Sequence, residues 1–170
     1  MIEKRSTESP IPLEIYTDGS LRSMGRQTFG GWAFIAVKNH KKIYEASGAE
    51  SDTTNQRMEL KAIYEALKYA KENRLVNESI FIYSDSAYAI NCYEQEWYVK
   101  WQMNGWTSAS KQPVANRDLW DVIIPFFDNF WYHFCKVKGH TNNFWNIQCD
   151  KLAQDASMQL KINWRGKPNE

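Results

Sequence analysis

Four acidic residues stand where a plain surface charge is out of place: Asp18, Glu59, Asp85 and Asp150. Asp18 and Asp85 each close a short apolar run, and Glu59 shares a helical stripe with Ile63. Carboxylates that are far apart in a chain, but stand at the ends of elements, can converge in a fold. Hard cations such as Mg²⁺ take oxygen ligands of this kind, and two such cations can drive in-line displacement at a phosphodiester. The set therefore indicates a divalent-metal site.

Each carboxylate also has an ordinary structural explanation. Asp18 precedes Gly19, and this dipeptide is a common turn signal. A glutamate in the first turns of a helix, such as Glu59, is favoured by the helix dipole and is usually solvated. Asp85 can be the N-cap of the next helix, and Asp150 can be an exposed residue of the last one. A single oxygen-rich cluster explains all four positions together, whereas the alternatives must each hold separately.

The elements that position these residues follow from periodicity and turn signals. Thr53, Thr54 and Asn55 offer N-cap oxygens for a helix that runs to about residue 73, whose apolar residues recur with the helical period of 3.6. Residues 80–83 form an uninterrupted apolar run that predicts a central strand buried on both faces, and its arrival through a helix favours parallel pairing. We also expect strands at residues 13–18, 31–38, 42–49 and 131–138, and helices from residue 86 and over residues 144–160. A further helix is expected over residues 118–130, which Pro125 can kink or end. Residues 97–113 are expected to form a short helix with a projecting loop.

This order predicts a mixed α/β fold, with one mixed five-stranded sheet flanked by helices. At 170 residues the chain has the size of one domain, which we place at residues 13–160 between tails at 1–12 and 161–170.

The net charge is only +1, so the chain as a whole is not a basic nucleic-acid binder. Three widely spaced cysteines suggest neither disulfides nor zinc, and no apolar run reaches the roughly 18 residues of a membrane span. We therefore expect a soluble, cytoplasmic monomer.

Four segments of the chain form an ordered set of motifs. They are Tyr16-Thr17-Asp18-Gly19-Ser20, Thr54-Asn55-Gln56-Arg57-Met58-Glu59-Leu60, Tyr83-Ser84-Asp85-Ser86, and Val137-Lys138-Gly139-His140 followed by Cys149-Asp150-Lys151-Leu152-Ala153. With them the chain resembles a type 1 ribonuclease H over about residues 13–158. The resemblance implies a ribonuclease H-like fold. It also implies an endonuclease that hydrolyses the RNA strand of RNA–DNA hybrids with two Mg²⁺ ions, or Mn²⁺, leaving 5′-phosphate and 3′-hydroxyl ends.

The resemblance also assigns roles to individual residues. Asp18 is expected to bridge the two metals, Glu59 and Asp85 to hold the metal that activates water, and Asp150 to help hold the other. His140 lies in a loop from which its imidazole can shuttle protons or assist product release.

Substrate contacts are expected from two regions. Asn55 and Gln56 are amides at a helix start, suited to base edges and to the ribose 2′-hydroxyl that distinguishes RNA from DNA. Arg57 is expected to contact phosphate or neighbouring carboxylates. The resemblance places a hybrid-gripping protrusion at residues 97–113. Its candidate contacts are Lys100, Trp101, Trp106 and Lys111.

The chain departs from the family pattern at four places. The protrusion carries few charges, which predicts a hybrid affinity that is weaker or more metal-dependent, with a shallow salt dependence. Residues 21–29, predicted to be a loop, lack the compact turn often found there and bring Arg22 and Arg26 near the site. Ala87 and residues 147–148 also differ.

Two alternative functions stay open. The first is a binding module of this fold that has lost turnover, and the second is a relative that acts on DNA alone, such as a transposase or junction resolvase domain.

Overall fold

The structure is a computed structural model that describes residues 10–137 and 143–165. Its elements follow the predicted order of strands and helices, with one additional 3-10 turn. They are β1 (Leu13–Met24), β2 (Gln27–Lys38), β3 (Lys41–Ser51), α1 (Asn55–Asn73), β4 (Ile80–Ser84), α2 (Ala87–Glu94), α3 (Trp97–Met103), α4 (Arg117–Ile123), η1 (Ile124–Phe126), β5 (Tyr132–Lys136) and α5 (Phe144–Arg165).

One five-stranded sheet, in the order β3-β2-β1-β4-β5, forms the centre of the fold. β1, β2 and β3 pair antiparallel, whereas β4 is parallel to both β1 and β5. The predicted mixed sheet and the parallel pairing of residues 80–83 are therefore confirmed. The burial of β4 differs from the prediction, because Ile80 and Ile82 are buried while Phe81 and Tyr83 are only half-buried.

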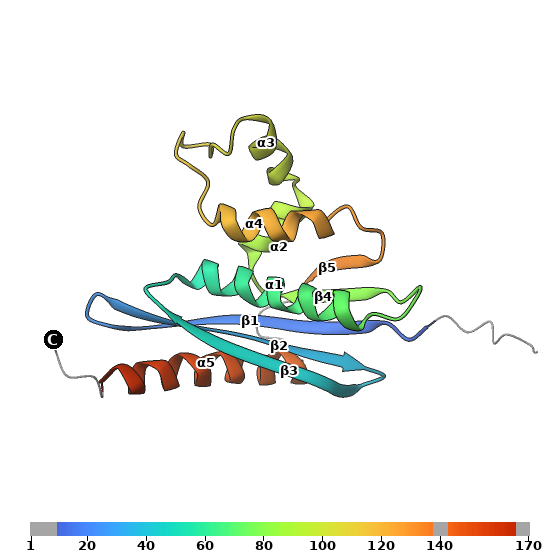
Figure 1. The fold of residues 1–170 in the computed structure, drawn as a ribbon, viewed down its shortest axis with the longest axis horizontal. Coiled ribbons are helices and arrows are strands. Elements are labelled where there is room, and N and C mark those ends of the chain that lie inside the picture. Colours follow the sequence, from blue (N-terminus) through green and yellow to red (C-terminus); the bar gives the residue numbers. More distant parts are fainter. Residues whose placement is uncertain (1–9, 138–142, 166–170) are drawn as a thin grey trace, which may run out of the picture.

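Helices cover both faces of the sheet, with α1 to α4 on one side and α5 on the other (Figure 1). Side chains alternate across a strand, so β1 contributes to two separate cores. Leu13 and Ile15 belong to the larger core with α1, and Tyr16 belongs to the smaller one with Cys149 and Ala153 of α5. β1 is thus the strand from which side chains reach both layers.

The hairpin between β1 and β2 is longer than the sequence predicts. Residues 21–29, predicted to be a loop, lie almost entirely in the two strands, and only Gly25 and Arg26 form the turn. Gly25 adopts φ +61°, a left-handed conformation that costs glycine little. The prediction of a loop was wrong because residues 21–24 have little intrinsic strand preference, and their conformation is set by cross-strand pairing with β2.

Two helix ends also differ from the predicted ones. α4 ends at Ile123, and a 3-10 turn containing Pro125 replaces the helix predicted to reach residue 130. Proline has no N–H for the helical ladder, which accounts for this end. α5 continues to Arg165, past the predicted end at residue 160, and the ring of Trp164 lies 5.9 Å from that of Phe29. Within the ranges that the structure describes, no helix is long and apolar enough to cross a membrane.

Candidate active site

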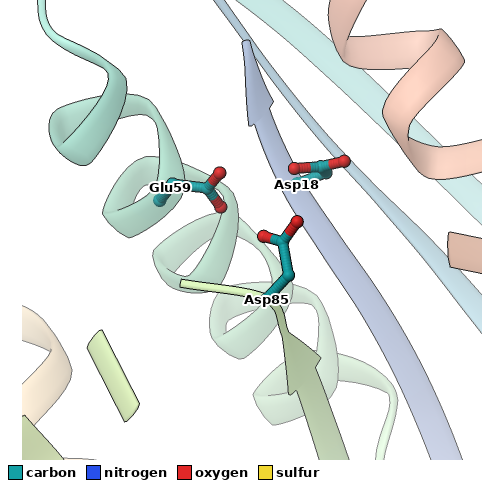
Figure 2. A group of neighbouring side chains, drawn as sticks. All are labelled: Asp18, Glu59 and Asp85. Atoms are coloured by element: carbon teal, nitrogen blue, oxygen red, sulfur yellow. The ribbon is translucent and has the colours of Figure 1, made fainter. Parts of the chain in front are cut away.

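Three of the four predicted carboxylates meet at one place. Asp18 projects from β1, Glu59 from α1, and Asp85 from the residue that follows β4 (Figure 2). One carboxylate oxygen of each lies within 4.8 Å of those of the other two. The convergence arises because β1 and β4 are adjacent parallel strands in a register that pairs Tyr16 with Tyr83. Asp18, two residues further along β1, therefore lies beside Asp85, which follows the end of β4. α1 packs closely on β1 at Gly19 and brings the third oxygen.

The approach of α1 to β1 depends on Gly19. A Cβ atom at this position would lie 2.6 Å from the backbone nitrogen of Glu59 and 2.8 Å from the carbonyl carbon of Met58. Both atoms belong to the backbone and cannot rotate away. Gly19 is therefore needed for the close contact that holds Glu59 beside Asp18, and its role is not that of a turn residue.

The ordinary explanations for the three carboxylates do not hold in the structure. Asp18 and Gly19 lie inside the twelve-residue strand β1 instead of in a turn. Glu59 is 6% exposed, so it is not a solvated residue of the first turn. The N-cap of α2 is Ser86, whose hydroxyl accepts from the backbone N–H of Ala89, and Asp85 is left without that role.

Burial and mutual repulsion disfavour the charged forms of these carboxylates. Burial, followed by the charges of Asp85 and Asp150, raises the pKa of Asp18 to about 7. Burial and the neighbouring Asp18 and Asp85 hold the pKa of Glu59 well above its ordinary value. The pKa of Asp85 is raised chiefly by burial and also by Asp150. Like charges held this close favour protonation of at least one member unless a cation is present.

One oxygen of the cluster has no partner among the described residues. Oε2 of Glu59 is buried without a hydrogen bond, whereas Oδ1 of Asp18 accepts from the N–H of Gly19 at 2.9 Å. The guanidinium of Arg57 donates to Asp118 and not to Glu59. A buried, unpaired carboxylate oxygen is costly, and a divalent cation would satisfy it. The donor set, all carboxylate oxygen, fits Mg²⁺ or Mn²⁺.

Asp150 lies near the cluster but does not belong to the group of three. It projects from α5, is half-buried, and its Oδ2 accepts from the side-chain amide of Gln154 at 2.8 Å. Its charge raises the pKa of both Asp18 and Asp85, so it lies within electrostatic reach of them. Its role as a fourth metal ligand stays a prediction.

His140 falls in residues 138–142, outside the described part of the chain. The structure does describe the residue where that segment meets α5. Oδ1 of Asn143 accepts from the backbone N–H groups of Trp145 and Asn146, at 3.0 and 3.2 Å. Asn143 therefore caps the first turn of the helix that carries Asp150.

The start of α1 combines exposed amides with a fixed guanidinium. Asn55 and Gln56 are exposed in the first turn of α1, as a substrate-contacting role requires. Arg57 donates two hydrogen bonds to the carboxylate of Asp118, at 2.9 and 2.6 Å. The carboxylate that Arg57 contacts therefore belongs to the first turn of α4, and its predicted contact with phosphate stays a prediction. Asp118 could not be identified from the sequence, because nothing in it indicates which of 20 acidic residues lies opposite Arg57.

The protrusion consists of α3 and the segment that follows it. Lys100 and Lys111 are exposed, as predicted. Trp101 and Trp106 are instead half-buried and lie against each other, with ring centroids 5.9 Å apart. The guanidinium of Arg117 lies 4.7 Å from the Trp106 ring centre. One face of each indole is therefore used within the protein, while Lys100 and Trp101 also line a hollow of about 410 Å³.

Comparison with known proteins agrees with this geometry. The sequence model of the RNase H family matches residues 11–158. A ribonuclease H from Thermoanaerobacter sp. (strain X514) is 45% identical to this chain over 159 residues, which cover 93% of this chain and 96% of that protein.

Two solved structures share the fold. LC9-RNase H1, a type 1 RNase H with the type 2 active-site motif, has a TM-score of 0.73 and 20% identity over 95% of this chain and 84% of that one. A foamy viral protease–reverse transcriptase in complex with an RNA/DNA hybrid has a TM-score of 0.76 and 21% identity over 94% of this chain and 22% of that one. The carboxylate cluster, the fold and the extent of the sequence match lead to one conclusion: the chain belongs to the RNase H family.

Proposed function

We propose that this enzyme is an endonuclease that hydrolyses the RNA strand of RNA–DNA hybrids by two-metal-ion catalysis, giving 5′-phosphate and 3′-hydroxyl ends. Family membership supports the substrate class, and a protein of the same fold has been solved with a hybrid bound. The observation that carries the proposal is the meeting of Asp18, Glu59 and Asp85 from three separate elements around a buried, unpartnered oxygen.

These residues, with Asp150, are the proposed ligands of two divalent cations. When bound, Mg²⁺ or Mn²⁺ would lower the pKa of the attacking water and stabilise negative charge on the leaving 3′-oxygen. Asp18 lies with Glu59 and Asp85 and within electrostatic reach of Asp150, so it would be the ligand common to both ions. Both Asp18 and Glu59 must lose any proton they hold before they can act as ligands. The raised pKa of Asp18, about 7, therefore makes cation binding weaker in acid.

The remaining residues have roles in positioning and proton transfer. Asn55 and Gln56 would recognise the ribose 2′-hydroxyl, because their amides are exposed beside Glu59 and can both donate and accept. Arg57 is held by Asp118, so we assign it to fixing the start of α1 against α4. His140 is proposed to exchange protons at the site and to assist product release.

The test is cleavage of a labelled RNA strand annealed to DNA, with Mg²⁺ or Mn²⁺, beside single-stranded RNA, double-stranded RNA and double-stranded DNA. Asp85→Asn should abolish the activity while leaving the protein folded. Asp155→Asn, which removes an exposed carboxylate of α5, is the matched control and should retain it. Extension of the cleaved RNA by a polymerase would show the 3′-hydroxyl end. A folded protein that binds hybrid but cuts nothing with either cation would favour a binding module, and cleavage of DNA alone would favour the other alternative.

A further inference from the structure

The row of side chains that begins at Asp18 continues along β1. Alternate residues of a strand share one face, so Ser20 and Arg22 lie on the same face as Asp18 and Tyr16. This is the face that α5 covers, because Tyr16 packs against Cys149 and Ala153. A row of polar side chains therefore leads away from the carboxylate cluster, between β1 and α5, and ends at the positively charged guanidinium of Arg22.

Arg22 is held in place by a buried hydroxyl group of α5. Its Nε donates to Oγ of Ser157 at 3.2 Å, and Ser157 is 0% exposed. The hydroxyl of Ser157 donates in turn to the backbone carbonyl of Gln154 at 2.8 Å. Its single proton is thus in use, and its oxygen can only accept. Oγ of Ser20, 3.5 Å away, must then be the donor toward Ser157.

The outer nitrogens of the Arg22 guanidinium have no protein partner in the described part of the chain. Within residues 10–137 and 143–165, no carboxylate lies within ion-pair distance of Arg22, and only Nε makes a hydrogen bond. Arg57 differs, since both of its terminal nitrogens are used by Asp118. A guanidinium fixed at Nε, with its fork open, is suited to bind a phosphate through two hydrogen bonds.

Neutralisation of the carboxylate cluster does not explain Arg22. Arg22 is four steps from Asp18 along the extended strand, a span of roughly 13 Å, which exceeds the Debye length of about 8 Å at physiological ionic strength. Arg22 is also not among the groups that shift the pKa of Asp18, whereas Asp85 and Asp150 are. The charge at Arg22 is therefore available to a ligand that reaches beyond the cluster.

We propose that Arg22, anchored by Ser157, with Ser20 beside it, forms a phosphate subsite for the strand that is cut, at a phosphate beyond the scissile one. The proposal rests on the proposed function, since it assumes a nucleic-acid strand bound at Asp18. Arg22 is on this view a binding residue, remote from the reacting atoms. It should affect the KM for hybrid and leave kcat unchanged.

The test compares Arg22→Gln with Arg26→Gln, two changes that each remove one positive charge from the same hairpin. Arg26 is an exposed turn residue beyond the end of β1, and that end, at Met24, is already about 20 Å from Asp18 along the strand. Arg22→Gln should raise KM for a long hybrid by about 3- to 10-fold and reduce the slope of log KM against log salt concentration by about one. Arg26→Gln should change KM less than about 2-fold and leave the slope as it is.

Two further variants separate a phosphate contact from a structural effect. Ser157→Ala removes the anchor but keeps the charge, and should raise KM about 2- to 3-fold with the salt slope unchanged. Arg22→Lys should keep the slope and recover part of the lost affinity. The melting temperature of each variant is measured alongside. The proposal would be overturned if the salt slope of Arg22→Gln equals that of wild type and a drop in its melting temperature accounts for its loss of activity.

Hybrids of different length give the decisive comparison. When the RNA strand is trimmed to within about two nucleotides of the cleavage site on the side that reaches Arg22, wild type and Arg22→Gln should have the same KM. If wild type does not cut hybrids at all, the proposed function fails. If wild type cuts hybrids, but Arg22→Gln behaves like Arg26→Gln on long and trimmed substrates alike, the proposed function stands and the subsite is refuted.

Discussion

Replacement of Asp18 by asparagine should stabilise the metal-free protein above neutral pH. Burial, followed by the charges of Asp85 and Asp150, raises the pKa of Asp18 from 3.8 to about 7. One pKa unit corresponds to about 1.4 kcal/mol, so ionised Asp18 costs the folded state about 4 kcal/mol. Asparagine removes that charge and keeps Oδ1, which accepts the hydrogen bond from Gly19. The gain for a chain of this length corresponds to a rise in melting temperature of about 10 °C.

The pH dependence gives the sign of the effect. Because the pKa of Asp18 is higher in the folded than in the unfolded state, its contribution to stability is fully present below about pH 4 and is lost as pH rises through about 7. The asparagine side chain in Asp18→Asn does not titrate. The difference in free energy of unfolding between Asp18→Asn and wild type should therefore be small near pH 4, grow between about pH 4 and 7, and then level off.

Urea unfolding across this pH range, with a chelator present, measures the difference directly. Asp155→Asn is the control, because it removes the same charge from an exposed position on α5 and should leave the free energy of unfolding nearly unchanged at every pH. Added Mg²⁺ should then stabilise wild type and have little effect on Asp18→Asn. Equal stability of wild type and Asp18→Asn near pH 8 in the chelator would refute the reasoning that repulsion and burial strain this cluster.

Two further substitutions test how the site is held. Gly19→Ala would place a Cβ 2.6 Å from the backbone of Glu59. We therefore expect the free energy of unfolding in urea to fall by about 1–3 kcal/mol and the cleavage activity to fall at least about tenfold. Gly25→Asn, at an open left-handed turn position, is the control and should keep both stability and activity. Arg57→Ala and Asp118→Ala should show a coupling free energy of about 0.5–1 kcal/mol in a double-mutant cycle of unfolding. The value is modest because the Asp118 side chain is 63% exposed. Strictly additive losses of stability would show that the ion pair does not fix α1 to α4.

The parts of the fold with strong local signals could be predicted from the sequence. Of the three candidate N-cap residues, Thr54 caps α1, its hydroxyl accepting from the N–H of Arg57, and α1 ends at residue 73 as predicted. The position of the strand at residues 80–84 and the burial of Glu59 also follow from hydrophobic pattern. In each case the residues that decide the structure lie within one turn or one strand of each other.

Features that depend on distant partners could not be predicted. The strand character of residues 21–24 comes from pairing with β2, and the pairing of Arg57 with Asp118 joins residues 61 positions apart. The hydrogen bond from Arg22 to Ser157 spans 135 positions. The need for glycine at position 19 could not be found either, because Asp-Gly is a turn signal and only the packed helix shows the other reason for it.

The raised pKa of Asp18, which the Asp18→Asn comparison tests, should also control how cation binding depends on pH. A cation that takes Asp18 as a ligand must displace the proton which the site holds below about pH 7. Its apparent affinity should therefore rise with pH up to about 7 and then become constant. At limiting Mg²⁺ the cleavage rate should follow the same curve, whereas saturating Mg²⁺ should shift the acid limb to lower pH. An acid limb that does not move with Mg²⁺ concentration would show that the titrating group is not a ligand, and would point to another residue, such as His140.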